Sequence, residues 1–142
     1  MKKKRAIIDD GCNPELVCGA TFDGFLEIPK INAPDNIIIP TGITPFSQRN
    51  RAPSVSEAIG FQEPDINFAE VLRTPSKYIS DFGRFAALIS PDCSLYRDAP
   101  LAVQIANLYR NRTIGSYYQR KGIYVIPQIR WGNELTYTTE YF

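Results

Sequence analysis

The chain has 142 residues, of which 44% are apolar and 12% aromatic, and this length and composition suit one domain with a buried core. Lys and Arg number 16 and Asp and Glu number 15, so the net charge of +1 argues against general electrostatic binding to nucleic acids or membranes. The sequence contains no histidine. A histidine general base, a zinc finger with histidine ligands and histidine-dependent nicking chemistry are therefore excluded.

Residues 1–36 are rich in turn-forming residues and predict an irregular N-terminal arm that wraps a single α/β domain formed by residues 37–142. The first five residues, MKKKR, resemble the start of a signal peptide, but Asp9 and Asp10 interrupt the apolar segment that a signal peptide needs. This basic terminus is either a solvated tail or an arm that binds nucleic acid. Every apolar run is too short to span a bilayer, so we expect no membrane partner.

The first half of the domain predicts short elements. Three consecutive isoleucines at residues 37–39 predict a short buried strand. Residues 43–56 are polar and contain two prolines, which favours a long loop, and residues 57–62 predict a second strand. A short helix begins at Asp65, and Pro75 ends it and starts a further turn or two.

The second half predicts a strand, a long helix and another strand. Phe85 to Ile89 form a continuous apolar run, which is typical of a strand covered on both faces. Residues 99–121 predict a helix, with Asp98 as its N-cap, and residues 123–126 predict the next strand. This order makes a βαβ unit with parallel strands, so the sequence predicts an α/β fold with a small, mainly parallel sheet.

The long helix has one residue that does not fit its pattern. At 100° per residue, its apolar side comprises Leu101, Ala102, Ile105, Leu108 and Tyr109, and its polar side comprises Gln104, Asn107, Arg110, Asn111 and Lys121. Arg112 falls on the apolar side. A buried guanidinium must be paired, so we interpret Arg112 as one half of a structural ion pair with a carboxylate. It lies about 20 Å from the start of the helix, which argues against a catalytic role.

The predicted helix is also longer than its sheet. It spans about 34 Å, whereas a five-residue strand spans about 17 Å. Either Gly115 breaks the helix or one end packs on something outside the βαβ unit.

Ligands of parallel sheets bind beyond the carboxyl ends of the strands. After the last two predicted strands come Asp92, Arg97, Asp98, Arg130 and Trp131. We expect Arg97 and Arg130, with the helix N-terminus, to hold an anion and Trp131 to stack on a planar group, and Asp92 is the candidate catalytic base or metal ligand. The set thus suits a nucleotide or another phosphate-bearing molecule. The alternative is that these residues tie loops together by ion pairs.

The sequence identifies no cofactor. The common phosphate-binding glycine motifs are absent, and three cysteines (Cys12, Cys18 and Cys93) are too few for an all-cysteine zinc site. We interpret them as reduced thiols of a cytoplasmic protein. As an alternative, Cys93 is a nucleophile whose thiolate is stabilised by Arg97 or a helix N-terminus.

The stretch from Arg97 to Arg130 carries six cations interleaved with tyrosines, a combination found in single-strand binders. Since Arg110, Arg112 and Arg120 point in different helical directions, packing is the alternative explanation for these tyrosines.

The block ISPDCSLYRDAPLAVQIANLYRNRTIGSYYQRKGIYVIPQIRWGNE resembles the signature of the family called domain of unknown function 4417. DGCNPELV, the FDG at residues 22–24 and IIIPTGITPF are also similar to that family. The resemblance implies a phage or mobile-element origin, an intracellular location and further elements after residue 142. It supplies no catalytic residues.

Three functions remain open. The first is binding of a phosphate-bearing small molecule at the carboxyl edge of the sheet, with or without catalysis. The second is binding of nucleic acid as a replication accessory protein, and the third is binding of a host protein. An exposed sheet edge at the shortened C-terminus would also favour association with a second copy of the chain.

Overall fold

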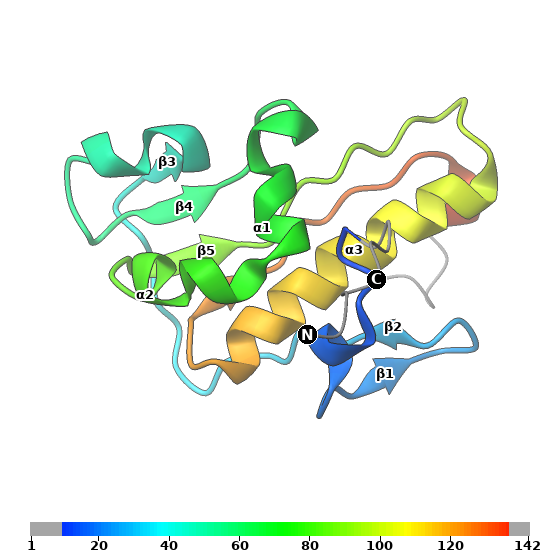
Figure 1. Ribbon diagram of the computed structural model, residues 1–142, viewed down its shortest axis with the longest axis horizontal. Helices are drawn as coiled ribbons and strands as arrows, with labels where there is room; N and C mark the ends of the chain where they lie inside the picture. The colour runs from blue at the N-terminus through cyan, green and yellow to red at the C-terminus, as the bar shows by residue number, and fades with distance from the viewer. Residues whose placement is uncertain (1–9, 137–142) are drawn as a thin grey trace, which may run out of the picture.

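The computed structural model describes residues 10–136 (Figure 1). The N-terminal MKKKR segment, interpreted above as a tail or a nucleic-acid arm, lies outside these residues. So does the C-terminal segment 137–142.

The central sheet has four parallel strands in the order β3 (Ile43–Pro45), β4 (Ala58–Gly60), β5 (Ala87–Ile89) and β6 (Val125–Ile126). A separate antiparallel hairpin is formed by β1 (Phe22–Asp23) and β2 (Ile28–Pro29). Strand β5 precedes the long helix in the sequence, β6 follows it, and the two strands pair in parallel. This pairing confirms the predicted βαβ unit. The α/β class with a small parallel sheet is therefore confirmed.

Three helices cover one face of this sheet: α1 (Ala69–Arg73), α2 (Ile79–Phe82) and α3 (Leu101–Arg120) (Figure 1). Short 3₁₀ turns at Asp65–Phe68 and Pro75–Tyr78 lead into α1 and α2, so helical structure begins at Asp65 and restarts at Pro75 as predicted. The main core joins sheet side chains to helix side chains, and its members include Ile59, Leu88, Val125, Phe68, Phe82, Ile114 and Tyr118. The opposite face carries the smaller cluster of Ala58, Ala87 and Ile89.

The prediction of a buried strand at residues 37–39 was wrong. Ile37 and Ile39 are 82% and 85% exposed, and the first strand of the sheet begins later, at Ile43, inside the predicted loop. Its polar Thr44 is buried, because its hydroxyl donates a hydrogen bond to Glu57 Oε2 at 2.5 Å. A satisfied hydroxyl can occupy a core position that its polarity in the sequence does not suggest.

Two details of α3 also differ from prediction. Pro100, not Asp98, is the N-cap, and within the described residues no side chain caps the helix. Gln104 and Asn111, assigned to the solvent side, are buried, whereas Ala102 on the predicted apolar side is exposed. The middle of α3 is enclosed by the sheet and the N-terminal segment, so polar side chains are buried there when they are hydrogen-bonded, as Asn111 Nδ2 is to Pro91 O at 2.7 Å.

The predicted excess length of α3 is real and lies at its start. The first turns of α3 project past the carboxyl ends of the strands (Figure 1). There the turn Glu134–Thr136 packs against the helix. The helix runs unbroken through Gly115. A Cβ at Gly115 would lie 2.4 Å from Ile31 Cδ1 and 3.0 Å from Ser90 Cβ. This glycine thus lets the end of β5 and the N-terminal segment approach the helix closely.

Changing Gly115 to valine is expected to lower the free energy of unfolding by about 2–3 kcal/mol, because the added methyls must displace Ile31 and Ser90. Urea denaturation monitored by circular dichroism measures the effect. Ala102→Val, at an exposed position of the same helix, controls for the cost of a β-branched residue and should lose about 0.5 kcal/mol. Equal losses in the two variants would contradict the close approach at Gly115.

Candidate functional site

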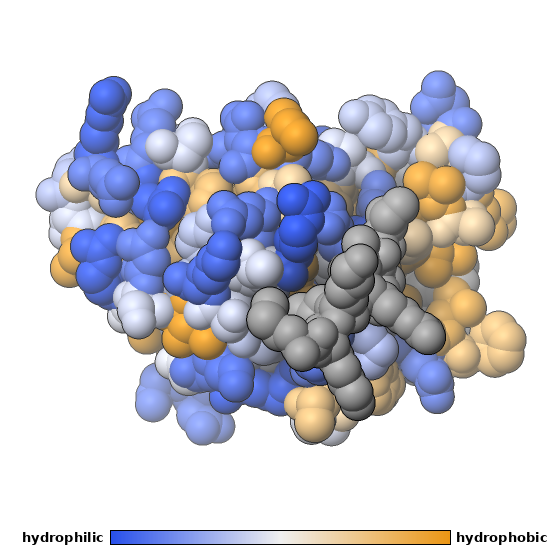
Figure 2. Space-filling model, viewed as in Figure 1, coloured by the Kyte–Doolittle hydropathy of each residue, from blue (hydrophilic) through white to orange (hydrophobic). Residues whose placement is uncertain are grey.

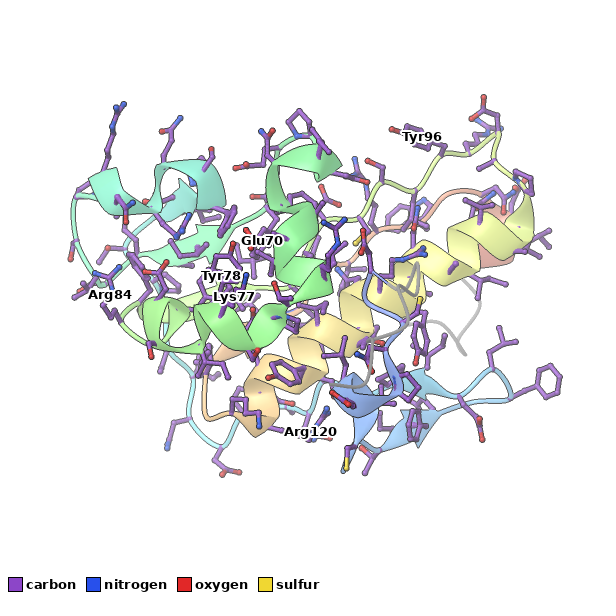
Figure 3. All side chains as sticks on the ribbon, in the orientation of Figure 1. Glu70, Lys77, Tyr78, Arg84, Tyr96 and Arg120 are labelled. Carbon is purple, nitrogen blue, oxygen red and sulfur yellow. The ribbon has the colours of Figure 1, made fainter. Side chains whose placement is uncertain are left out.

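The structure brings two of the five predicted site residues into direct contact. Arg130 Nη1 donates to Asp92 Oδ1 at 2.8 Å, with the Asp92 side chain mostly buried and that of Arg130 half exposed. Arg97 and Asp98 are exposed on the loop before α3, beside Tyr96, which points outward in Figure 3. Among the ion pairs of residues 10–136, neither Arg97 nor Asp98 joins the pair of Arg130 and Asp92. Trp131 is 55% exposed. The five-residue site therefore stays a prediction.

Other polar residues of this edge hold the loop after β5 in place. Asp65 accepts hydrogen bonds from the amide and the hydroxyl of Ser94 at 3.2 and 3.0 Å. Asn107 on α3 donates to the carbonyl of Ser94 at 2.6 Å. Gln62, after β4, donates to the Gln128 side chain, after β6, at 3.0 Å. These hydrogen bonds tie the loops together through residues outside the predicted set.

Cys93 is not placed as a nucleophile. It is buried, and burial, followed by the nearby Asp65 carboxylate, raises the pKa of its thiol to about 12, which the Arg110 guanidinium only partly offsets. A thiol with this pKa is protonated at neutral pH and is a poor nucleophile.

We expect a thiol-specific reagent such as dithionitrobenzoate to label two cysteines of the native protein quickly at mildly alkaline pH. Cys12 and Cys18 are exposed, whereas Cys93 is buried and should react only after denaturation. Cys12→Ser should reduce the fast count by one. Three fast thiols in the native protein would contradict the burial of Cys93.

Another polar cluster lies on the surface of α1 and the following turn (Figure 3). Tyr78 Oη and Lys77 Nζ donate to the two carboxylate oxygens of Glu70 at 2.8 and 3.1 Å. The hydrogen bonds from Tyr78 and then Lys77 hold the pKa of Glu70 below its usual value. The three groups satisfy one another, so this cluster connects α1 to the turn Pro75–Tyr78.

Arg112 occupies a different position from the one predicted. Because the start of α3 projects beyond the sheet, the middle of the helix lies beside the carboxyl ends of β5 and β6. Arg112 Nη1 donates to the Gln128 carbonyl at 3.2 Å and to the side chain of Asn111. Asn111 in turn accepts from Ser90 Oγ at 3.1 Å, just after β5. This network fixes the guanidinium at the sheet edge where α/β proteins bind ligands.

The predicted carboxylate partner of Arg112 is missing from the part of the chain that the structure describes. Arg112 is 7% exposed, and none of the ion pairs among residues 10–136 includes it. Burial alone lowers the pKa of its guanidinium, without removing the charge at neutral pH. Burying a charge without an ionic partner costs free energy.

Arg112 lines a cavity of about 330 Å³ beside the carboxyl end of β6. The walls come from three parts of the chain: β1–β2 and the segment after it, α3, and the residues that follow β6. The lining residues are Asp23, Ile28, Pro29, Lys30, Ile31, Asn32, Ala33, Arg112, Pro127 and Ile129. This volume is at the small end of the range for small-molecule sites.

The wall opposite the strands is fixed to α3. The backbone of Asn32 makes two hydrogen bonds with the side chain of Gln119, each 2.8 Å long. Lys30 N donates to Thr21 O at 2.9 Å across the hairpin. At the rim, Lys30 and Asp23 form an ion pair of 3.5 Å whose side chains are about half exposed. The charge of Arg112 is therefore the unbalanced one among the residues that line the cavity.

The cations of the Arg97–Arg130 stretch do not form one surface. Arg110 donates to Asp10 O at 2.8 Å, and Arg120 donates to Leu16 O and Ser116 Oγ. Tyr118 is fully buried, and its hydroxyl donates to Pro75 O at 2.8 Å. These side chains attach the N-terminal segment and the helices to α3, which matches the packing alternative.

Among residues 10–136, no group of three or more cysteine, aspartate or glutamate side chains is arranged to hold a metal ion. Within the same residues, no helix is both long and apolar enough to cross a membrane.

Comparisons with known proteins place the chain in a family. Residues 20–141 match the model of the family described as Domain of unknown function (DUF4417). The chain is 30% identical over 114 residues to the Gene 1 protein of Mycobacterium phage L5, a match covering 78% of this chain and 49% of the phage protein. It is 35% identical over 80 residues to the Gene 1 protein of Mycobacterium phage D29, covering 56% of this chain and 30% of that one.

The chain thus spans half or less of the length of these two phage relatives. No solved structure matches it. The predicted family resemblance is confirmed: the chain belongs to the family described as Domain of unknown function (DUF4417), and its sequence is similar to those of two phage proteins.

Proposed function

We propose that this domain binds a small anionic molecule in the cavity beside the carboxyl end of β6, and that Arg112 holds the anion. The observation that carries the proposal is a buried guanidinium that lines a cavity and has no carboxylate partner among residues 10–136. Arginine presents several donors in a plane and forms paired hydrogen bonds with phosphates and carboxylates. Phosphate-bearing molecules, including nucleotides, are thus among the candidate ligands, and the sequence analysis predicted the same ligand class for a different set of residues.

The surroundings of Arg112 support this role. Its contacts with Asn111 and Gln128 both use Nη1 and involve uncharged oxygens, so they orient the guanidinium without neutralising it. A preorganised donor of this kind loses little freedom when it binds an anion. The nucleic-acid and host-protein alternatives have no comparable observation in their favour.

The test is a thermal-shift and calorimetric titration of the full chain with inorganic phosphate, AMP, ATP and small carboxylates. We expect at least one of these anions to stabilise the wild-type protein and Arg112→Gln to abolish that shift. Arg84→Gln is the matched control, since Arg84 (labelled in Figure 3) pairs with Asp81 and does not line the cavity, so this variant should bind as the wild type does.

The same titration distinguishes the two candidate sites. Arg130→Gln removes the ion pair between the half-exposed Arg130 and the mostly buried Asp92, and it should lower the free energy of unfolding by about 1–2 kcal/mol. Loss of anion binding in Arg130→Gln with normal binding in Arg112→Gln would overturn the proposal in favour of the sequence-predicted site. No stabilisation of the wild type by any anion would overturn both.

A further inference from the structure

The lining of the cavity also restricts the chemistry of the anion. We propose that the ligand is a small monocarboxylate with an aliphatic body, and not a nucleotide or another polyanion. This inference rests on the proposed function, because it concerns what the same cavity selects.

Charge balance is the first argument. Among residues 10–136, no carboxylate balances the positive charge of Arg112, whereas Lys30 is already paired with Asp23 at 3.5 Å. A monoanion therefore neutralises the site. A dianion or a triphosphate would leave further negative charge in a partly buried cavity, and uncompensated buried charge is unfavourable.

The walls give the second argument. Apart from the charged residues and Asn32, the described lining residues are isoleucines, prolines and one alanine. None of these described residues is aromatic, so the cavity offers no ring on which a nucleobase could stack. Aliphatic walls instead favour an aliphatic body, and each methylene they bury strengthens binding about fourfold.

The size of the cavity agrees with these two arguments. About 330 Å³ is at the lower limit for small-molecule sites, so a carboxylate with a short branched chain suits it better than a nucleotide. The anion would contact Arg112, and the aliphatic chain would lie against Ile31 and Ile129.

The experiment is a heteronuclear NMR titration of the full chain with acetate, butyrate and 4-methylpentanoate, and separately with inorganic phosphate, AMP and ATP. We expect affinity to rise about fourfold per added methylene in the carboxylate series. Arg112→Gln should lose binding of every carboxylate. Ile129→Asn, at a wall position that is 57% exposed, should keep acetate binding but flatten the dependence on chain length.

A second variant tests the charge count. Asp23→Asn removes the partner of Lys30 and leaves two unbalanced cations at the cavity, so it should improve the binding of inorganic phosphate relative to butyrate. Asp35→Asn, an exposed aspartate that does not line the cavity, is the matched control and should leave this ratio unchanged.

The outcomes separate this inference from the proposed function. Arg112-dependent binding of AMP or ATP without carboxylate binding would overturn the monocarboxylate inference and leave anion binding standing. Carboxylate binding that does not depend on chain length would overturn the aliphatic part of the inference. If none of the probes binds, both proposals are overturned.

Discussion

Replacing Arg112 with methionine is expected to leave the unliganded protein as stable as the wild type, or more stable, and to abolish stabilisation by anions. The guanidinium is buried without a described carboxylate, so its removal ends an unfavourable burial of charge, while methionine retains most of the packing volume. Asn111 Oδ1 keeps its hydrogen bond from Ser90. Urea denaturation with and without the binding anion measures both effects.

A structural role for Arg112 predicts the opposite result. Breaking a buried ion pair by removing one partner typically costs about 3–5 kcal/mol. A loss of this size in Arg112→Met without ligand would show that Arg112 holds the fold together. Arg120→Met is a useful control, because it also removes a hydrogen bond to a backbone carbonyl, that of Leu16, but Arg120 does not line the cavity, so this variant should keep its stabilisation by anions.

Replacing Phe82 with alanine is expected to lower the free energy of unfolding by about 3–5 kcal/mol. Phe82 is fully buried, and its ring lies 5.2 Å from that of Tyr118 and 6.0 Å from that of Phe61, between centroids. The substitution removes these contacts and leaves a cavity where α2 packs on α3 and the sheet. Denaturant unfolding measures the loss.

Phe25→Ala is the control for this prediction. Phe25 is 87% exposed in the turn between β1 and β2, so its loss should change stability by less than about 0.5 kcal/mol. Figure 2 shows that apolar side chains also lie at the surface of the molecule. Similar losses for Phe25→Ala and Phe82→Ala would contradict the position of the core.

Whether a strand could be predicted from the sequence depended on its place in the sheet. Residues 87–89 are apolar on both faces, and their continuous run in the sequence was correctly predicted as a buried strand. β3 is an edge strand with a proline and a buried threonine, so its sequence does not differ from that of a loop. The isoleucines at 37–39 are apolar but exposed, which shows that an apolar run alone does not place a segment in the core.

Arg112 shows which features of the candidate site could be predicted from the sequence and which could not. Its position on an apolar helix face correctly indicated a buried guanidinium. The sequence could not show that α3 begins well beyond the sheet, and this offset places Arg112 at the carboxyl edge. Nor could it show that Lys30 and Ile31 form the opposite wall, because that contact joins segments about eighty residues apart and depends on the tertiary fold.

The most direct test of the central claim is an NMR titration that follows the side-chain Nε–Hε signals of the arginines. The Arg112 signal is assigned by its loss in Arg112→Lys, and those of Arg84 and Arg130 by the corresponding substitutions. Anion binding at the cavity predicts a saturable shift of the Arg112 signal with the same affinity as the thermal stabilisation, while the Arg84 signal stays unchanged. A stabilising anion that shifts the Arg130 signal and leaves that of Arg112 in place would contradict it.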